Sequence, residues 1–256
     1  MQGISLEWFY LPLSSLELVY AISIVFIAGV VRGLAGFGFS ALCFFSLAPV
    51  FSAQTIVPLM FVMEAMASFH MLPKVWRQIP WRWVGLLFVG ASVGIPLGVM
   101  VLQHWQSDWV RGLAGAGVLI ACLALWRKWH FKSAESLNWL VFAGLVSGFV
   151  NGLASIGGLV VAVYMLSSTM PLKVMRAGIV LFFLIVNLYG LFWLNGHDLV
   201  SPHLPSLLLV MMPVMLLSNQ LGYSLFNRID IDMMRKFTLA LLSGLATIAL
   251  YSALSS

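Results

Sequence analysis

Two charged side chains are unusual for their surroundings, because each lies within or beside a long apolar stretch. Glu64 is the tenth residue of an apolar run over 55–72, and Arg32 adjoins a glycine-rich segment that follows an apolar run over 16–31. A carboxyl group shielded from water is poised to carry a proton, because desolvation disfavours its charged form. A guanidinium can hold an oxyanion through two parallel hydrogen bonds. The two residues therefore indicate proton and anion chemistry.

Each of these residues also has a plainer interpretation. Arg32 could be an ordinary charge on the cytoplasmic side of a complete membrane span, with its side chain extending to the surface. Glu64 could be a neutral carboxyl group that hydrogen-bonds to a neighbouring helix. His70, six residues after Glu64, is a second candidate for proton coupling, but its position near the end of a run is also typical of an interfacial residue.

Two glycine-rich segments are the next candidates for binding. Residues 28–40 read AGVVRGLAGFGFS and residues 147–159 read SGFVNGLASIGGL, with six of 13 positions identical at a shift of 119. Glycine lets the backbone leave a helix, and a half-helix that starts within a membrane presents free N–H groups and a positive dipole end to an anion. The expected anion contacts are Arg32, Gly36, Phe37, Gly38, Phe39 and Ser40 in the first segment, and Asn151, Ser155, Ile156, Gly157 and Gly158 in the second.

The glycines also allow a packing interpretation. Gly29 and Gly33, like Gly148 and Gly152, are spaced by four residues, as in motifs that let helices approach closely. For these four we expect packing, and for the later glycines we expect a binding role. Three further amides, Asn187, Asn219 and Gln220, lie in apolar runs and could bind substrate oxygens, although hydrogen bonding between helices is the commoner role of such residues.

The composition places these residues in a bilayer. The chain has 256 residues, of which 62% are hydrophobic and 8% are charged, and its mean hydropathy is +1.03. A soluble domain has about 25% charged residues, so a soluble enzyme and a nucleic-acid-binding domain are excluded. The histidines lie at run ends or in loops without metal-ligand spacing, and the two cysteines lie in apolar runs. We therefore expect no enzymatic activity, no metal and no cofactor.

Ten apolar runs span about two-thirds of the chain, and we expect them to be helices. A helix needs about 20 residues to cross the roughly 30 Å of hydrocarbon. The first, second, sixth and seventh runs are shorter, and they form two pairs, each joined by a glycine-rich segment. Either all ten runs cross, or each short pair forms a re-entrant or discontinuous hairpin beside six spans. The runs are 16–31, 38–51, 55–72, 84–102, 109–126, 139–150, 157–170, 174–194, 204–225 and 237–254.

The repeated segments indicate an internal duplication within a single membrane domain. The first repeat covers residues 16–127 and the second covers 137–254, with five runs in each. A unit with an odd number of crossings places its second copy upside down, so we expect an all-α fold of two inverted repeats. Paired, glycine-interrupted segments at matching places in such repeats are the best sequence indication of a transporter binding site.

The basic residues indicate the orientation. Cytoplasmic loops of membrane proteins are rich in Lys and Arg, and eleven of the 13 basic residues fall on one side by the parity of the runs. Both termini are then expected outside the cytoplasm. The eleven are Lys74, Arg77, Arg82, Arg127, Lys128, Lys132, Lys173, Arg176, Arg228, Arg235 and Lys236.

The doubled motif G-x-x-x-G-L-A-(G/S)-x-G and the tripeptide Ile156-Gly157-Gly158 resemble those of the TauE/SafE family. The resemblance extends over nearly the whole chain in size, duplication and loop pattern. It implies a permease that moves small sulfur-containing anions, such as sulfite or organosulfonates, outward across the inner membrane. The first segment departs from the family pattern, with Gly38-Phe39 where a Gly-Gly pair is expected.

The residues and the resemblance together predict a secondary transporter that exports a small anion by alternating access, with protons as the candidate coupling ion. The alternatives are a drug/metabolite-type permease, which also has ten spans in inverted repeats, and a passive anion channel. The expected partners are the anion, the lipid bilayer and, as an option, a second copy of the chain. No nucleic-acid partner is expected.

Overall fold

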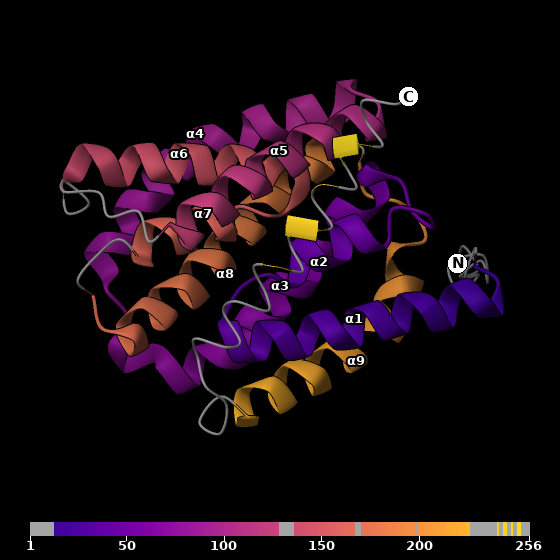
Figure 1. The fold of residues 1–256 in the computed structure, drawn as a ribbon, viewed down its shortest axis with the longest axis horizontal. Helices are drawn as coiled ribbons and strands as arrows, with labels where there is room; N and C mark the ends of the chain where they lie inside the picture. Colours follow the sequence, from indigo (N-terminus) through magenta and orange to yellow (C-terminus); the bar gives the residue numbers. More distant parts are fainter. Residues whose placement is uncertain are drawn as a thin grey trace, which may run out of the picture.

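Helices make up the regular structure of the described residues. The computed structural model describes residues 13–127, 136–166, 170–197 and 199–225, and a few positions between 240 and 251. The tenth predicted run falls almost entirely outside this part, as do Lys128, Lys132, Arg228, Arg235 and Lys236. The helices (Figure 1) are α1 (Ser15–Ala35), α2 (Phe39–Ser46), α3 (Ala53–Val75), the 3₁₀ turn η2 (Trp76–Gln78), α4 (Trp81–His104), α5 (Ser107–Trp126), α6 (Leu137–Ala154), α7 (Gly158–Leu166), α8 (Leu172–Gly196) and α9 (Leu204–Leu225).

Six of the described helices are long and apolar enough to cross a membrane: α1, α3 with η2, α4, α6, α8 and α9. Large apolar side chains also lie on the outer surface, where they would contact lipid; Leu16, Phe192 and Leu217 are 81%, 72% and 71% exposed. The prediction of an all-α integral membrane protein is confirmed at this level.

The predicted lengths of the first and sixth runs were wrong. These runs have 16 and 12 residues in the hydropathy pattern, but α1 has 21 residues and α6 has 18. At a rise of 1.5 Å per residue these helices are about 32 Å and about 27 Å long. The helices continue through Arg32 and Asn151, because both side chains are buried against protein rather than exposed to lipid.

The second member of each pair is too short to cross. The eight residues of α2 and the nine of α7 rise only about 12–14 Å. Helix α2 runs back along α1, since the Tyr20 hydroxyl near the start of α1 donates to the Ser46 carbonyl at the end of α2, at 2.7 Å. Within the described residues, therefore, each pair combines one helix of spanning length with one half-length helix. Neither ten complete spans nor two hairpins of short helices beside six spans describes this arrangement fully.

Glycine contacts fix two pairs of parallel helices. A β-carbon on Gly222 of α9 would lie 2.9 Å from Cα of Gly33 on α1, and one on Gly98 of α4 would lie 3.0 Å from the carbonyl carbon of Gly152 on α6. Such backbone approach is what small residues allow in membrane helices. The predicted packing role of Gly33 and Gly152 is thus confirmed. Figure 1 shows α1 beside α9 at one edge of the molecule and α4 beside α6 at the other.

Helices α3 and α8 pack against each other between these two edges. They carry the buried polar side chains Glu64 and Ser68 on α3 and Asn187 on α8. Placing these residues centrally shields their polar groups from lipid, where an unsatisfied polar group costs several kcal/mol. The two short helices bring their first residues to the same central region.

Basic side chains gather where α1 and α9 end. Arg176 donates to the Gly33 carbonyl at 2.7 Å, Lys74 donates to Gln220 Oε1 at 2.7 Å, and both cations lie over the ring of Tyr223. Arg111, in the first turns of α5, donates to the carbonyl of Phe51. Lys74 and Arg176, two of the eleven basic residues that the parity of the runs places on one side, thus share one end of the bundle.

Candidate functional site

Both glycine-rich segments break their helices at corresponding residues. Helix α1 ends at Gly36, which has φ +82° and donates its N–H to the Arg32 carbonyl at 2.7 Å. Helix α6 ends at Ser155, which has φ +59° and donates to the Asn151 carbonyl at 2.6 Å. Residues 36 and 155 differ by the same 119 positions as the sequence repeat. Left-handed backbone is uncommon outside glycine, so Ser155 keeps this turn at a cost in energy.

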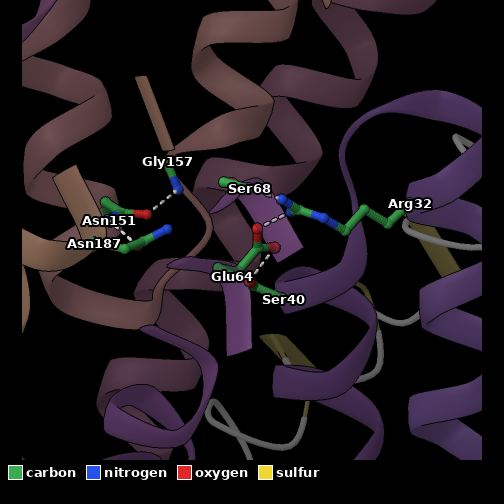
Figure 2. A network of polar contacts seen from close by, with 7 residues as sticks. All are labelled: Arg32, Ser40, Glu64, Ser68, Asn151, Gly157 and Asn187. Atoms are coloured by element: carbon green, nitrogen blue, oxygen red, sulfur yellow. Dashed lines mark hydrogen bonds and ion pairs between the residues drawn. The ribbon is translucent and has the colours of Figure 1, made fainter. Parts of the chain in front are cut away.

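Arg32 is buried in the last turn of α1, with 2% of its surface exposed. Its NH1 forms an ion pair with Oε2 of Glu64, and its NH2 donates to Ser68 Oγ at 3.0 Å. Figure 2 shows the Arg32 side chain pointing toward Glu64 and Ser68. The guanidinium also lies over the ring of Phe183, 5.5 Å from its centroid. The interpretation of Arg32 as a charge that extends to the membrane surface is therefore wrong.

Glu64 joins three helices. Besides its ion pair with Arg32 of α1, its Oε1 accepts a hydrogen bond from Ser40 Oγ, in the first turn of α2, at 2.7 Å. Only 2% of Glu64 is exposed. The carboxyl group is thus held by a charged partner, which the interpretation of a simple neutral hydrogen-bonding carboxyl did not include.

The second segment carries a neutral version of the same arrangement. Asn151 Nδ2 donates to Asn187 Oδ1 at 3.1 Å, and the Gly157 N–H donates to Asn151 Oδ1 at 3.3 Å. At a shift of 119 residues, Asn151 and Asn187 correspond to Arg32 and Ser68, which are also hydrogen-bonded to each other. Phe183 corresponds to Glu64. One half of the molecule therefore contributes a buried charge pair and the other half contributes amides.

A small cavity lies where the two breaks meet. It offers about 10 Å³ to the centre of a water-sized sphere, which is room for about one water molecule. The Oγ atom of Ser155 is buried at this cavity and has no hydrogen-bond partner among the described residues. Arg32 lies behind Glu64 and does not line the cavity. Residues from both halves do: Gly38, Ser40, Glu64, Ser155, Gly158 and Phe183.

Several predicted site residues lie elsewhere. Phe37 and Phe39 are packed in the apolar core. His70 is exposed and contacts Gln220 at 3.4 Å, with Lys74 on the same amide oxygen. Neither His70 nor Gln220 contacts Glu64.

Asn219 lies on the face of α9 that packs against α1. Its backbone carbonyl approaches Gly33, and its side-chain amide is buried without a hydrogen-bond partner in the described part of the chain.

Ser68 and Phe183 are site residues that the sequence reasoning did not select. Ser68 is one helical turn after Glu64, a spacing that places both on one face of α3. Phe183 is the counterpart of Glu64 in the second repeat. An alignment of the two repeats could therefore have identified both Ser68 and Phe183 as site residues.

Comparison with protein families finds a match over most of the chain. The family described as "Sulfite exporter TauE/SafE" matches residues 21–249. This range includes both glycine-rich segments and the buried polar residues Arg32, Ser40, Glu64, Ser68, Asn151 and Asn187. No curated protein and no solved structure matches the chain.

Proposed function

Because the chain belongs to the sulfite exporter TauE/SafE family, we propose that it is a secondary transporter that carries sulfite or a small organosulfonate out of the cell across the inner membrane. The family is one of transporters, which supports the proposal that this chain is a transporter rather than an enzyme. The observation that carries the more specific proposal is the buried Arg32–Glu64 ion pair beside the cavity between the two helix breaks.

The proposed binding site lies between the first turns of α2 and α7. Ser40 and Ser155 contribute hydroxyl groups from opposite halves of the cavity lining, and helix N-termini favour negative charge. Arg32 is the proposed counter-ion, and its Nε has no hydrogen-bond partner among the described residues. The guanidinium therefore retains a donor for a substrate oxygen. Asn151 and Asn187 are proposed to position the Gly157 break through their hydrogen bonds.

The cavity is too small for sulfite in the observed conformation, so binding requires the two halves to move apart. We propose that residues 16–127 and 137–254 are inverted repeats that move relative to each other in alternating access. Two features support this proposal: the α1–α9 contact at Gly33 and Gly222 and the α4–α6 contact at Gly152 and Gly98 occupy corresponding places in the duplication. Inverted repeats with binding at their interface are a common transporter design.

The orientation is proposed from the basic residues. Arg176 and Lys74 lie at the end of the bundle where α1 and α9 terminate, and this end is proposed to face the cytoplasm. The N-terminus of α1 then faces away from the cytoplasm. Glu64 is the proposed proton carrier, since it is the buried carboxyl group at the cavity; His70 contacts Gln220 instead and is not included.

Transport by the purified protein in liposomes tests this function. We expect wild-type protein to release entrapped sulfite or methanesulfonate, and Arg32→Ala to release neither, because the anion loses its counter-ion. Arg77→Ala removes the same kind of group from an exposed position in η2 and serves as the matched control. Unchanged efflux of every responsive anion from Arg32→Ala liposomes would exclude Arg32 from the site.

The same liposomes separate the alternatives. A passive channel passes the anion with its charge, so an imposed membrane potential changes the flux. A drug/metabolite-type permease would have the four short runs as uninterrupted spans, and the paired helix breaks at Gly36 and Ser155 favour the exporter over it.

A further inference from the structure

The carboxylate of Glu64 lies between the cavity and the guanidinium of Arg32. Glu64 and Ser40 line the cavity, whereas Arg32 contacts Glu64 from behind. An anion that enters the cavity therefore meets an ionised carboxylate before it can reach the buried cation. The anion and the Glu64 carboxylate carry charges of the same sign, and in a poorly solvated site such charges repel each other strongly.

From this arrangement, and on the basis of the function proposed above, we propose that the anion replaces Glu64 as the counter-ion of Arg32 and that Glu64 takes up a proton at the same step. The proton comes from the water on the side where the anion is loaded, and it returns to water on the side where the anion is released. Anion and proton therefore cross the membrane together and in the same direction. This excludes an exchange of anion for proton.

The charge balance of the site supports this order of events. In the empty state Arg32 is neutralised by Glu64, and in the loaded state it is neutralised by the anion while Glu64 is protonated. Binding the anion without the proton would bury an extra negative charge, and protonating Glu64 without the anion would leave Arg32 unpaired. Uncompensated buried charges are costly, so each ligand increases the affinity for the other by the same factor.

No other charged group in the described structure contacts Glu64. Ser40 from α2 donates a hydrogen bond to it, and Phe183 from α8 lines the same cavity. Arg176 of α8 is bound to the Gly33 carbonyl and lies over Tyr223 of α9. The remaining titratable groups on α3 and on the elements packed against it are Cys43 of α2, His70 and Lys74 of α3, Arg77 of η2, Arg82 and His104 of α4, Asp108, Arg111 and Cys122 of α5, and Lys173 and Tyr189 of α8; described α6 has none.

The ion pair also gives the empty transporter a way to return. Because Arg32 and Glu64 neutralise each other, the site without substrate can change its exposure without moving net charge. A monovalent anion with one proton is likewise neutral in sum. The complete cycle with a monoanion is therefore electroneutral.

The direction of proton movement is the decisive measurement. Methanesulfonate is the probe, because its charge is the same at every pH used and it does not cross lipid as a neutral acid. Wild-type protein is placed in liposomes that contain a pH-sensitive dye, and an inward methanesulfonate gradient is applied. We expect the lumen to become more acidic, at a rate that an imposed potassium diffusion potential does not change.

Two variants test the assigned roles. Glu64→Gln imitates the protonated carboxyl group, so it should exchange labelled methanesulfonate across the membrane without acidifying the lumen. Its affinity for methanesulfonate should not depend on pH, whereas that of the wild type should rise as the pH falls, because binding of the anion takes up a proton. Arg77→Ala is the control and should acidify the lumen as the wild type does.

The outcomes separate this inference from the proposed function. Alkalinisation of the lumen, or methanesulfonate flux without any change in pH, would overturn the joint movement of proton and anion while leaving the transporter function intact. Acidification that persists in Glu64→Gln would overturn the role of Glu64. Absence of both sulfite and methanesulfonate flux in the wild type would overturn the proposed function itself.

Discussion

Replacing Glu64 with leucine removes one member of a buried ion pair and leaves the other. Arg32 is 2% exposed and would keep its hydrogen bond to Ser68, but no described carboxylate would balance its charge. Breaking a buried pair in this way costs about 3–5 kcal/mol of stability, whereas replacing both members with apolar residues is often neutral or stabilising. We therefore expect Glu64→Leu and Arg32→Met each to be destabilised by about 3–5 kcal/mol, and the double variant to be close to the wild type.

Unfolding of the four proteins in a detergent–denaturant titration measures this double-mutant cycle. The expected coupling free energy is then about 6–10 kcal/mol in magnitude. The double variant should be folded and inactive in transport, which shows that the charges serve the transport function rather than the fold. A Glu64→Leu variant as stable as the wild type would refute the ion pair, and a double variant as unstable as the singles would refute the view that the charges are dispensable for folding.

The same variant offers a direct readout of anion binding. In Glu64→Leu the anion has no carboxylate to displace, so methanesulfonate should restore stability by supplying a counter-ion to Arg32. Binding to the folded state alone adds about 2.7 kcal/mol when the ligand concentration is 100 times its Kd. Chloride at the same ionic strength is the control for screening. Equal effects of the two salts would show that the stabilisation is not specific to the sulfonate.

Three further predictions concern the helices that position the site. Gly33→Leu places a side chain against the backbone of Gly222, so α1 and α9 must separate and the melting temperature should fall sharply. Gly117→Ala on α5 is the control, because nothing lies within 4 Å of the added carbon. Its stability should be unchanged or rise by up to about 1 kcal/mol from helix propensity. Ser155→Gly relieves the left-handed strain at φ +59° and should stabilise the protein by about 1 kcal/mol. Gly36→Ala at φ +82° should destabilise it by a similar amount. Thermal unfolding in which Ser155→Gly is less stable and Gly36→Ala more stable than the wild type would contradict the two helix breaks. Asn151→Leu and Asn187→Leu each remove the hydrogen bond between the two amides. A double-mutant cycle in the same unfolding assay should show a coupling free energy of about 0.6–1.7 kcal/mol. Additive effects of the two substitutions would indicate that the contact is absent.

The class of fold could be predicted from the sequence because it depends on composition. A chain with 62% hydrophobic and 8% charged residues cannot bury its apolar surface in a soluble fold of this length. In membrane hydrocarbon every backbone N–H and C=O group must be hydrogen-bonded within the protein, which leaves few backbone structures besides helices. The helix ends could not be predicted in the same way. Hydropathy ends a run at a polar residue, but Arg32 and Asn151 lie inside helices because their partners are protein atoms. A hydropathy pattern does not contain information about such partners.

The members of the site could be identified singly, but their arrangement could not. Arg32 and Glu64 are unusual for their apolar surroundings, whereas their ion pair depends on how α1 packs near α3, across 31 intervening residues. His70 illustrates the converse. It shares a helix with Glu64, but six residues along a helix is more than one and a half turns, and its side chain contacts Gln220 of α9 instead.

The proposed duplication relates the single charge pair of the site to uncharged counterparts in the second half. Arg32 and Asn151 occupy corresponding positions, and so do Glu64 and Phe183, so a fully symmetrical site would bury two cations and two carboxylates beside one small cavity. Each additional buried ion carries its own desolvation cost. With amides at Asn151 and Asn187 and an aromatic ring at Phe183, the second half completes the walls of the cavity without adding charge. The proposed transport cycle moves one anion with one proton and therefore needs one counter-ion and one proton acceptor, and the single pair of Arg32 and Glu64 offers one of each.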